Sequence, residues 1–254
     1  DEPRDRNNVQ NPFRAMYDYN PYETKYQVDD DNNTLFDEFG QPLWNLTGNG
    51  FSISEALVNN PEDEYSTTIL GGVTAKATIS DGLTNTFKVG ATNVRSRREY
   101  FNKPGSVLDG YVGDADNPGS KTDNGSMFLS YVITNLLSYN TVINEKHDFT
   151  VTGLFEFNKN TSRSYSLSSI GFSNPDFSVQ SVAALPDAAS TSLFENTILS
   201  YGAFIDYGYD GRFFVTASAR RDSSSVFGSN NRSGTFTSAS AAWNMAKEDW
   251  WDFE

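Results

Sequence analysis

The residue types that most often carry out catalysis are scarce in this sequence of 254 residues. It has no cysteine and a single histidine, His147, which excludes thiolate metal sites, cysteine nucleophiles and two-histidine zinc motifs. His147 opens an expected strand beside a turn, and no G-x-S-x-G elbow supplies a serine for it to activate. We therefore give His147 a structural role and predict no catalytic residue, no metal ligand and no cofactor.

Aromatic side chains are frequent in the N-terminal region, at Tyr17, Tyr19, Tyr22, Tyr26 and Trp44. Aromatic faces stack on sugar rings, and amphipathic aromatic residues are also common at protein interfaces. For any one of these residues, packing within a loop is the simpler interpretation. As a group, they are our candidates for contact with a substrate or a partner protein.

Acidic residues cluster in the same region: Asp29, Asp30, Asp31, Asp37 and Glu38. Oxygen ligands at alternate positions would suit calcium. An EF-hand register that begins at Asp29 fails, however, because Thr34 stands at the glycine position and Gly40 at the final glutamate position. A solvated acidic loop is the simpler prediction.

Two further groups invite a functional interpretation. Three arginines lie near the end of one expected strand: Arg95, Arg97 and Arg98. They would suit lipopolysaccharide phosphates, and a solvated strand end explains them equally well. Three tryptophans lie near the C-terminus: Trp243, Trp250 and Trp251. These fit an interfacial aromatic girdle or a short helix, and need no ligand.

The elements that would position these residues are mostly strands. Runs rich in Thr, Val, Phe, Tyr and Ser predict seven strands, at residues 65–80, 84–101, 126–143, 147–163, 197–209, 212–222 and 235–245. Tight turns at 81–82, 144–146 and 210–211 alternate with long polar connections. The best helix candidate, Ile53–Asn59, is too short to be stable alone.

Residues within the strands alternate in polarity. In the fourth, Phe149, Val151 and Phe155 fall on one face, and Thr150 and Thr152 on the other, which suits a strand between lipid and a wet lumen. Alternating short and long connections are typical of outer-membrane barrels, which in bacteria have an even number of strands. We therefore predict an all-β protein: an antiparallel up-and-down transmembrane β-barrel, here a partial set of about seven strands of a larger barrel.

Composition is consistent with this. The formal net charge is −14, and an acidic chain lacks the basic footprint of a nucleic-acid binder. Charged residues make up 20% and aromatic residues 14%, against a usual charged share of about 25%. No run approaches the ~18 apolar residues of a membrane helix, whereas membrane strands need only about 10 residues with alternate apolar positions.

Motifs in the last quarter of the chain carry a family resemblance. They are DYGYDGR (206–212), VTASARRDSSSVFG (215–228), NNRSGTFTSAS (230–240) and AWNMAKED (242–249). In order and spacing they resemble the signature region of SusC/RagA-type TonB-dependent transporters of Bacteroidetes. Upstream, residues 20–43 and 146–162 are similar more loosely. Ser223, Val226 and Ser233 depart from the family pattern.

The resemblance implies energised import of oligosaccharides through the bacterial outer membrane, or of peptides as in RagA-like members, without enzymatic activity. It implies a SusD-like surface lipoprotein as partner, and TonB–ExbB–ExbD as energy source through N-terminal regions that this sequence does not contain. The barrel would contact membrane lipid and lipopolysaccharide. Residues 1–64 would form an extracellular loop region, 65–245 the strands with short periplasmic turns and long extracellular loops, and 246–254 a short periplasmic segment.

A different class of protein remains as the alternative. A soluble or surface β-sandwich that binds carbohydrate or protein would also be rich in strands. It would need two packed sheets around an apolar core, and its alternating connection lengths would be a coincidence.

Overall fold

The computed structural model describes residues 22–36, 40–46, 52–228 and 231–251. Packing divides the chain into two compact units. Unit 1 comprises residues 1–65, 96–125 and 165–191, and unit 2 comprises residues 66–95, 126–164 and 192–254. No helix in the described part of the chain is long and apolar enough to cross a membrane.

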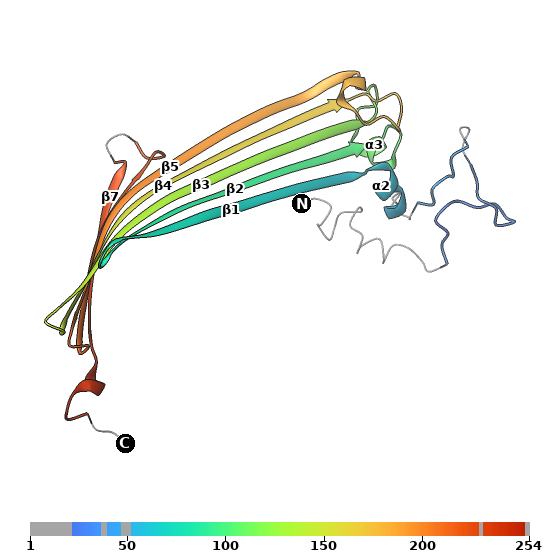
Figure 1. Cartoon of the computed structure of the whole chain (residues 1–254). Coiled ribbons are helices and arrows are strands. Elements are labelled where there is room, and N and C mark those ends of the chain that lie inside the picture. The colour runs from blue at the N-terminus through green and yellow to red at the C-terminus, as the bar shows by residue number, and fades with distance from the viewer. Residues whose placement is uncertain (1–21, 37–39, 47–51, 229–230, 252–254) are drawn as a thin grey trace. The chain divides into compact units, whose positions relative to one another are not determined.

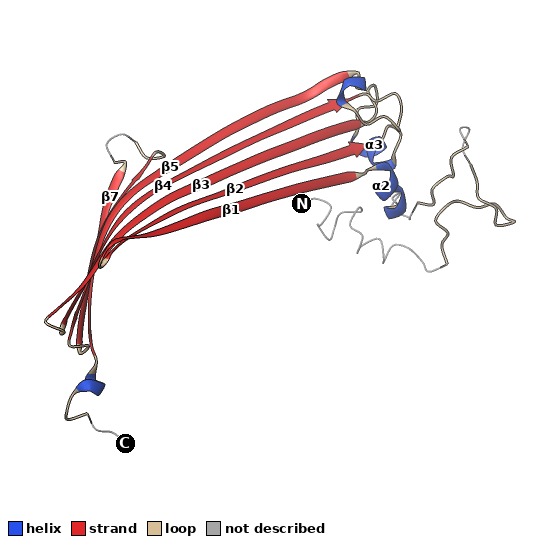
Figure 2. Ribbon diagram, viewed as in Figure 1, coloured by secondary structure: helices blue, strands red, loops and turns tan. Residues whose placement is uncertain are grey.

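Seven strands in the described residues form one sheet, in which the order of strands follows their order along the chain (Figures 1 and 2). The strands are β1 Glu62–Ser80, β2 Leu83–Asn102, β3 Ser120–Ile143, β4 His147–Ile170, β5 Leu185–Tyr209, β6 Phe213–Ser224 and β7 Ser233–Trp243. The pairing of β5 with β6 and of β6 with β7 is antiparallel. The predicted fold, a partial set of seven strands of an up-and-down barrel, is confirmed.

Three of the strand connections are tight turns, as predicted. They contain residues in the left-handed region of backbone conformation: Gly82 (φ 73°), Asn144 (φ 53°) and Asp210 (φ 53°) among them. Glycine, asparagine and aspartate adopt this conformation at low cost, so the local sequence fixes where the chain reverses.

The other connections are shorter than the sequence predicted. Strands β3, β4 and β5 extend past their expected limits of 126, 163 and 197. Their extra residues, such as Ser120–Gly125 of β3 and Pro186–Thr191 of β5, are mostly small or polar. They lack the alternation of apolar and polar residues on which strand prediction depends.

In the described part of the chain, four short helical elements accompany the sheet: α2 Ile53–Asn59, α3 Val107–Val112, η2 Gln180–Val182 and η3 Met245–Lys247. The candidate helix at 53–59 is present, and the α3 helix was not predicted. The Ser52 side chain caps α2 by accepting a hydrogen bond from the Glu55 N–H, and the Ser106 side chain caps α3 by accepting one from the Asp109 N–H. In unit 1, α2 and α3 contact each other.

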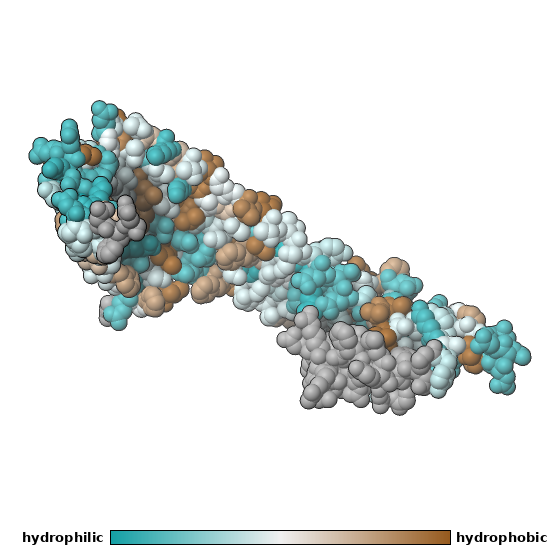
Figure 3. All heavy atoms as spheres, turned by 90° about the horizontal axis from the view of Figure 1, so that it is seen from below, coloured by the Kyte–Doolittle hydropathy of each residue, from teal (hydrophilic) through white to brown (hydrophobic). Residues whose placement is uncertain are grey.

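The described residues contain very little apolar core. Phe101 and Phe172, in unit 1, are the only buried hydrophobic residues among them, and their rings meet edge to face at 5.1 Å. Apolar side chains, brown in Figure 3, are instead exposed at the molecular surface. A β-sandwich requires two sheets around a core, so this single sheet does not fit the sandwich alternative.

Candidate functional site

The sheet of unit 2 has two chemically different faces, which follow from the alternation of side chains along each strand. One face carries exposed side chains that are almost all apolar, and we call it the apolar face. Its residues are Val151 and Phe155 on β4, Tyr201, Ala203 and Ile205 on β5, and Val215, Ala217 and Ala219 on β6. The other face is mostly polar, and we call it the polar face. It carries Thr152 and Glu156 on β4, Ser200 on β5, and Thr216, Ser218, Arg220 and Asp222 on β6, none of them exposed, together with the half-buried Leu154 and Phe204 and the exposed Asp206. This is the reverse of a soluble sheet, whose apolar side chains are the covered ones.

The register of β5 and β6 confirms that these residues share faces. Ala203 lies opposite Ala219 and Ile205 opposite Ala217, whereas Ser200 lies opposite Asp222. On the polar face, Ser218 and Ser238 share a hydrogen bond of 2.7 Å between hydroxyl oxygens. Lipid can cover the first face and water the second.

An ion-pair network occupies the polar face. The Arg220 guanidinium lies 2.6 Å from Asp222 Oδ1 and 3.2 Å from Glu156 Oε1, and it also donates to the hydroxyl of the fully buried Ser200 at 3.1 Å. Thr134 adds a longer contact of 3.4 Å to Glu156. The network thus links the four neighbouring strands β3 to β6 through hydrogen bonds and ion pairs between polar side chains.

Two groups of aromatic rings mark the ends of the apolar face. Near the short turns, the ring centroids of Phe149 and Tyr207 are 4.7 Å apart, and those of Phe213 and Trp243 are 6.1 Å apart. Toward the long connections, Phe155 meets Tyr201 at 5.6 Å. From Tyr201 to Tyr209 is eight residues of strand, about 26 Å at ~3.3 Å per residue. Tilted by ~40°, they span about 20 Å, close to the ~25 Å apolar band of membrane barrels.

His147 belongs to the first of these aromatic groups. Its Nδ1 lies 2.8 Å from the Tyr207 hydroxyl oxygen, and its ring centroid is 5.0 Å from that of Tyr209. These contacts fit the structural role predicted for this histidine. Trp243 donates through Nε1 to Glu248 at 3.1 Å, and its ring lies 5.9 Å from that of Trp250.

The predicted aromatic site is in part described. Tyr17 and Tyr19 lie outside the described residues. Tyr22 is 82% exposed. Tyr26 and Trp44 form an antiparallel bridge with ring centroids 4.9 Å apart, and the Lys25 ammonium lies 5.0 and 5.2 Å from these two centroids.

Backbone hydrogen bonds hold this segment in place. Gln27 donates to Leu43, Leu43 to Leu35 and Leu35 to Gln27, each at 2.8 or 2.9 Å. These bonds form a closed cycle of three short extended pieces, where the sequence predicted an irregular loop. The cycle brings Tyr26 and Trp44, which are distant in sequence, into one surface.

The acidic cluster takes part in the same segment. Asp29 accepts hydrogen bonds from the N–H groups of Asn33 at 2.8 Å and Asp31 at 3.0 Å. The backbone N–H and side-chain amide of Asn33 hold the pKa of Asp29 below its usual value. This carboxylate therefore stabilises a turn, while Asp37 and Glu38 lie outside the described residues.

The arginines near the end of β2 have acidic neighbours. Arg97 pairs with Glu99 at 3.0 Å and stands over the Tyr65 ring at 5.0 Å, and Arg98 pairs with Glu62. The positive charges of Arg97 and Arg98 are thus neutralised by carboxylates within unit 1. This fits the simpler interpretation of these arginines as part of a solvated strand end.

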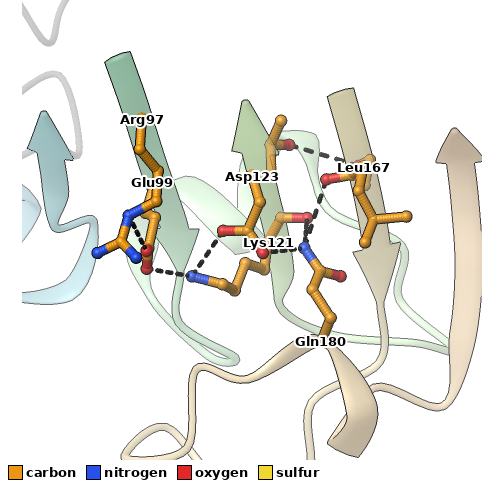
Figure 4. A network of polar contacts seen from close by, with 8 residues as sticks. Arg97, Glu99, Lys121, Asp123, Leu167 and Gln180 are labelled. Atoms are coloured by element: carbon orange, nitrogen blue, oxygen red, sulfur yellow. Dashed lines mark hydrogen bonds and ion pairs between the residues drawn. The ribbon is translucent and has the colours of Figure 1, made fainter. Parts of the chain in front are cut away.

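Sequence reasoning missed a polar cluster in unit 1, shown in Figure 4. The side chain of Lys121 is 4% exposed, and its ammonium lies 3.0 Å from both Glu99 and Asp123. Gln180 extends from the 171–184 connection and donates to Asp123 Oδ2 at 2.9 Å and to the carbonyls of Lys121 and Leu167 at 3.4 and 3.3 Å. One glutamine thereby fastens this connection to β3 and β4.

One antiparallel sheet with an exposed apolar face, a less exposed polar face and aromatic rings at both ends of the apolar face defines a class of protein: it is part of the wall of an outer-membrane β-barrel. No family model matches the sequence. The chain is 28% identical over 197 residues to TonB-dependent receptor P39 of Formosa agariphila, and 30% identical over 122 residues to TonB-dependent receptor P3 of the same organism. These alignments cover 75% and 46% of this chain, and 18% and 12% of the two relatives.

Among solved structures, the chain is similar to the RagAB peptide transporter, with a TM-score of 0.73 and 23% sequence identity over 92% of this chain and 25% of that chain. The predicted resemblance to TonB-dependent transporters is confirmed, as is the predicted location in the outer membrane. The proteins that it resembles are receptors and transporters, so the prediction that the chain is not an enzyme is confirmed too. The chain spans about a fifth of the length of the first of these relatives.

Proposed function

We propose that this chain forms part of the barrel wall of a TonB-dependent transporter that imports oligosaccharides. The observation that carries the proposal is the reversed distribution of polarity in unit 2, with Val151, Phe155 and Ile205 exposed and Ser200 fully buried. A conduit needs such a wall and no catalytic group, since its work is capture and passage.

In this proposal the long connections face the medium, the short turns face the periplasm, and a SusD-like surface lipoprotein covers the outer side. Energy reaches the barrel from TonB–ExbB–ExbD through N-terminal regions of the whole protein. The acidic and aromatic content of residues 22–46 supports this orientation, because solvated charge belongs outside the apolar band.

The exposed Tyr22 and the pair formed by Tyr26 and Trp44 support oligosaccharides as the substrate class. Sugar rings present apolar C–H faces that stack on aromatic rings, and the neighbouring Lys25 adds a hydrogen-bond donor. The likeness to the RagAB peptide transporter concerns the fold and does not favour peptides.

The test uses the full-length protein in cells with and without functional TonB. Uptake of labelled oligosaccharides is expected to require TonB, and Trp44→Ala is expected to weaken uptake at low substrate concentration about three- to tenfold. Tyr111→Ala, which removes a 66% exposed aromatic residue of α3, is the control. TonB-dependent uptake of peptides but not oligosaccharides would contradict the proposed substrate class.

A further inference from the structure

Three phenylalanines interrupt the polar face of unit 2: Phe204 on β5, Phe214 on β6 and Phe236 on β7. Phe204 lies opposite Ser218, Phe236 lies opposite Arg220, and Phe214 is four residues from Ser218 on the same strand. Paired residues share a face of a sheet, as do residues at even spacing along one strand. The three rings therefore stand on the polar face, and Phe214 and Phe236 are 43% and 61% exposed there.

Each ring leans over a glycine: Phe204 over Gly202, Phe214 over Gly208 and Phe236 over Gly234. An added Cβ at any of the three glycines would lie 3.3 or 3.4 Å from the nearest atom of its ring. A side chain in that place would crowd the ring. Glycine instead lets the ring lie along the sheet and turn one aromatic face away from it.

Hydrogen-bonding groups alternate with the rings. Asp206 and Thr216 lie opposite each other, between Phe204 and Phe214, and the Thr216 hydroxyl donates to Asp206 Oδ1 at 2.8 Å. Ser218, opposite Phe204, adds a further hydroxyl. Sugars have apolar C–H faces with hydroxyl groups around the ring, so this alternation matches their chemistry.

The rings follow one another along the wall. Phe236 stands at the level of Arg220, which is six residues of β6 from Phe214. Six residues of strand span about 20 Å at ~3.3 Å per residue. One chain of linked sugar rings can therefore touch more than one of the three aromatic faces.

The charge beside these rings is negative. Arg220 pairs with Glu156 and Asp222, and Asp206 is a third carboxylate, exposed between Phe204 and Phe214. Three carboxylates therefore stand beside one guanidinium. An acidic sugar would be repelled there, whereas an uncharged sugar could use the carboxylates as hydrogen-bond acceptors.

We propose that Phe204, Phe214 and Phe236 form an aromatic track on the lumen side of the wall, which binds uncharged oligosaccharides by stacking on their sugar rings. The inference rests on the proposed function, because the polar face must line the lumen of a conduit for oligosaccharides. It adds a place of contact within the wall to the pair formed by Tyr26 and Trp44, and it narrows the substrate class to uncharged sugars.

The test titrates the purified full-length transporter in detergent, by calorimetry, with neutral oligosaccharides of glucose, galactose, mannose or xylose. The track variant, Phe204→Leu with Phe214→Leu and Phe236→Leu, keeps apolar side chains and removes the aromatic faces. It is expected to bind the best of these ligands about tenfold more weakly. Tyrosine at the same three positions keeps the faces and should retain the wild-type affinity.

The matched control makes the same change on the apolar face, with Phe149→Leu, Phe155→Leu and Phe213→Leu, and should bind like the wild type. Equal loss in both leucine variants, full affinity in the track variant, or no binding of any neutral oligosaccharide would overturn the inference. If the track variant does not assemble, the three single leucine variants replace it. Each should weaken binding about two- to threefold, and unchanged affinity in all three would overturn the inference equally.

Oligosaccharides of uronic acids test the role of charge. They are expected to bind the wild type about tenfold more weakly than the neutral ligand, and Asp206→Asn should narrow this difference. Equal binding of uronic and neutral oligosaccharides would refute the restriction to uncharged sugars.

TonB-dependent uptake in cells separates this inference from the proposed function. Uptake of an oligosaccharide that requires TonB and is unchanged in the track variant would reject the track alone. Lost uptake with unchanged binding would assign the rings to a contact within the protein, and would overturn the inference too. A wild type that takes up no oligosaccharide in a TonB-dependent way would reject the proposed function itself.

Discussion

Arg220 of β6 donates a hydrogen bond to Glu156 of β4 at 3.2 Å, across the strand β5 that lies between them. The same guanidinium reaches Asp222 on its own strand at 2.6 Å. One cation thus balances two carboxylates on a face that is partly withdrawn from solvent.

Replacing Arg220 by alanine is expected to destabilise the barrel, because Glu156 and Asp222 would then repel each other without a shared cation. The side chains of Arg220, Glu156 and Asp222 are each about one-third exposed. The free energy of unfolding is therefore expected to fall by about 1 to 2 kcal/mol. Urea unfolding of the full-length protein in lipid-free detergent measures it. Arg221→Ala, the next residue on the opposite face, is the control, and an equal loss there would contradict the prediction.

The assignment of the two faces predicts unequal costs for arginine at neighbouring positions of β6. Ala217→Arg would place a charge against lipid, at a cost of about 2 to 4 kcal/mol near the middle of the bilayer. Ser218→Arg would place it on the polar face, beside Ser238. The comparison is made by folding equilibria of the two variants in lipid vesicles. A smaller cost at Ala217 than at Ser218 would show that the faces are reversed.

Gly82 is expected to tolerate no side chain. Its φ is 73°, and an added Cβ would lie 2.1 Å from the Asn140 carbonyl oxygen, so Gly82→Ala must shift the β1–β2 turn. Gly105 has a similar φ of 77°, but nothing lies within 4 Å of its added Cβ. Gly105→Ala should therefore lower the free energy of unfolding by only about 1 kcal/mol, the cost of placing a residue other than glycine at a positive φ. Heat-modifiable migration of the assembled barrel compares the variants, and equal stability would refute the steric explanation.

Gln180 is expected to control the 171–184 connection. Gln180→Ala removes its three hydrogen bonds to Lys121, Asp123 and Leu167, so amide hydrogen exchange in this connection should accelerate. The neighbouring substitution Val179→Ala changes a side chain that is 55% exposed, and it should leave the exchange rates unchanged. Unaltered exchange in the Gln180 variant would mean that other contacts hold the connection.

The lowered pKa of Asp29 predicts an acid-sensitive turn. A carboxyl whose pKa is depressed in the folded state stabilises that state at pH above its usual value. The contribution is then lost as the pH falls through the lowered folded-state pKa. Amide exchange at Asn33, corrected for the intrinsic pH dependence, should rise in that acidic range for the wild type. Asp29→Asn should remove this dependence, and persistence of it would assign the transition to another group.

The strands and their turns were predictable because both signals are local. Asp-Gly pairs favour the left-handed conformations of a tight turn, and the alternation of Phe149, Val151 and Phe155 with polar residues needs no knowledge of neighbours. The outer parts of β3 and β5 were missed because Ser120–Gly125 and Pro186–Thr191 show no alternation of apolar and polar residues.

The polar cluster around Lys121 could not be predicted in the same way. Glu99, Lys121 and Gln180 come from three separate parts of the chain, and their meeting depends on strand register and on the path of a connection. Tyr26 and Trp44 illustrate an intermediate case. Their residue types were recognised as candidates for binding, but the backbone cycle that brings them together leaves no pattern in the sequence.

The near absence of an apolar core has a calorimetric consequence. Unfolding of soluble domains raises the heat capacity mainly because buried apolar surface becomes hydrated. In the described residues, Phe101 and Phe172 are the only buried hydrophobic residues. The larger apolar area lies on the exposed apolar face of the sheet, where detergent would cover it. The heat-capacity increment of this protein should therefore depend on whether the amphiphile stays bound to the unfolded chain, and should change with the length of the amphiphile's tail.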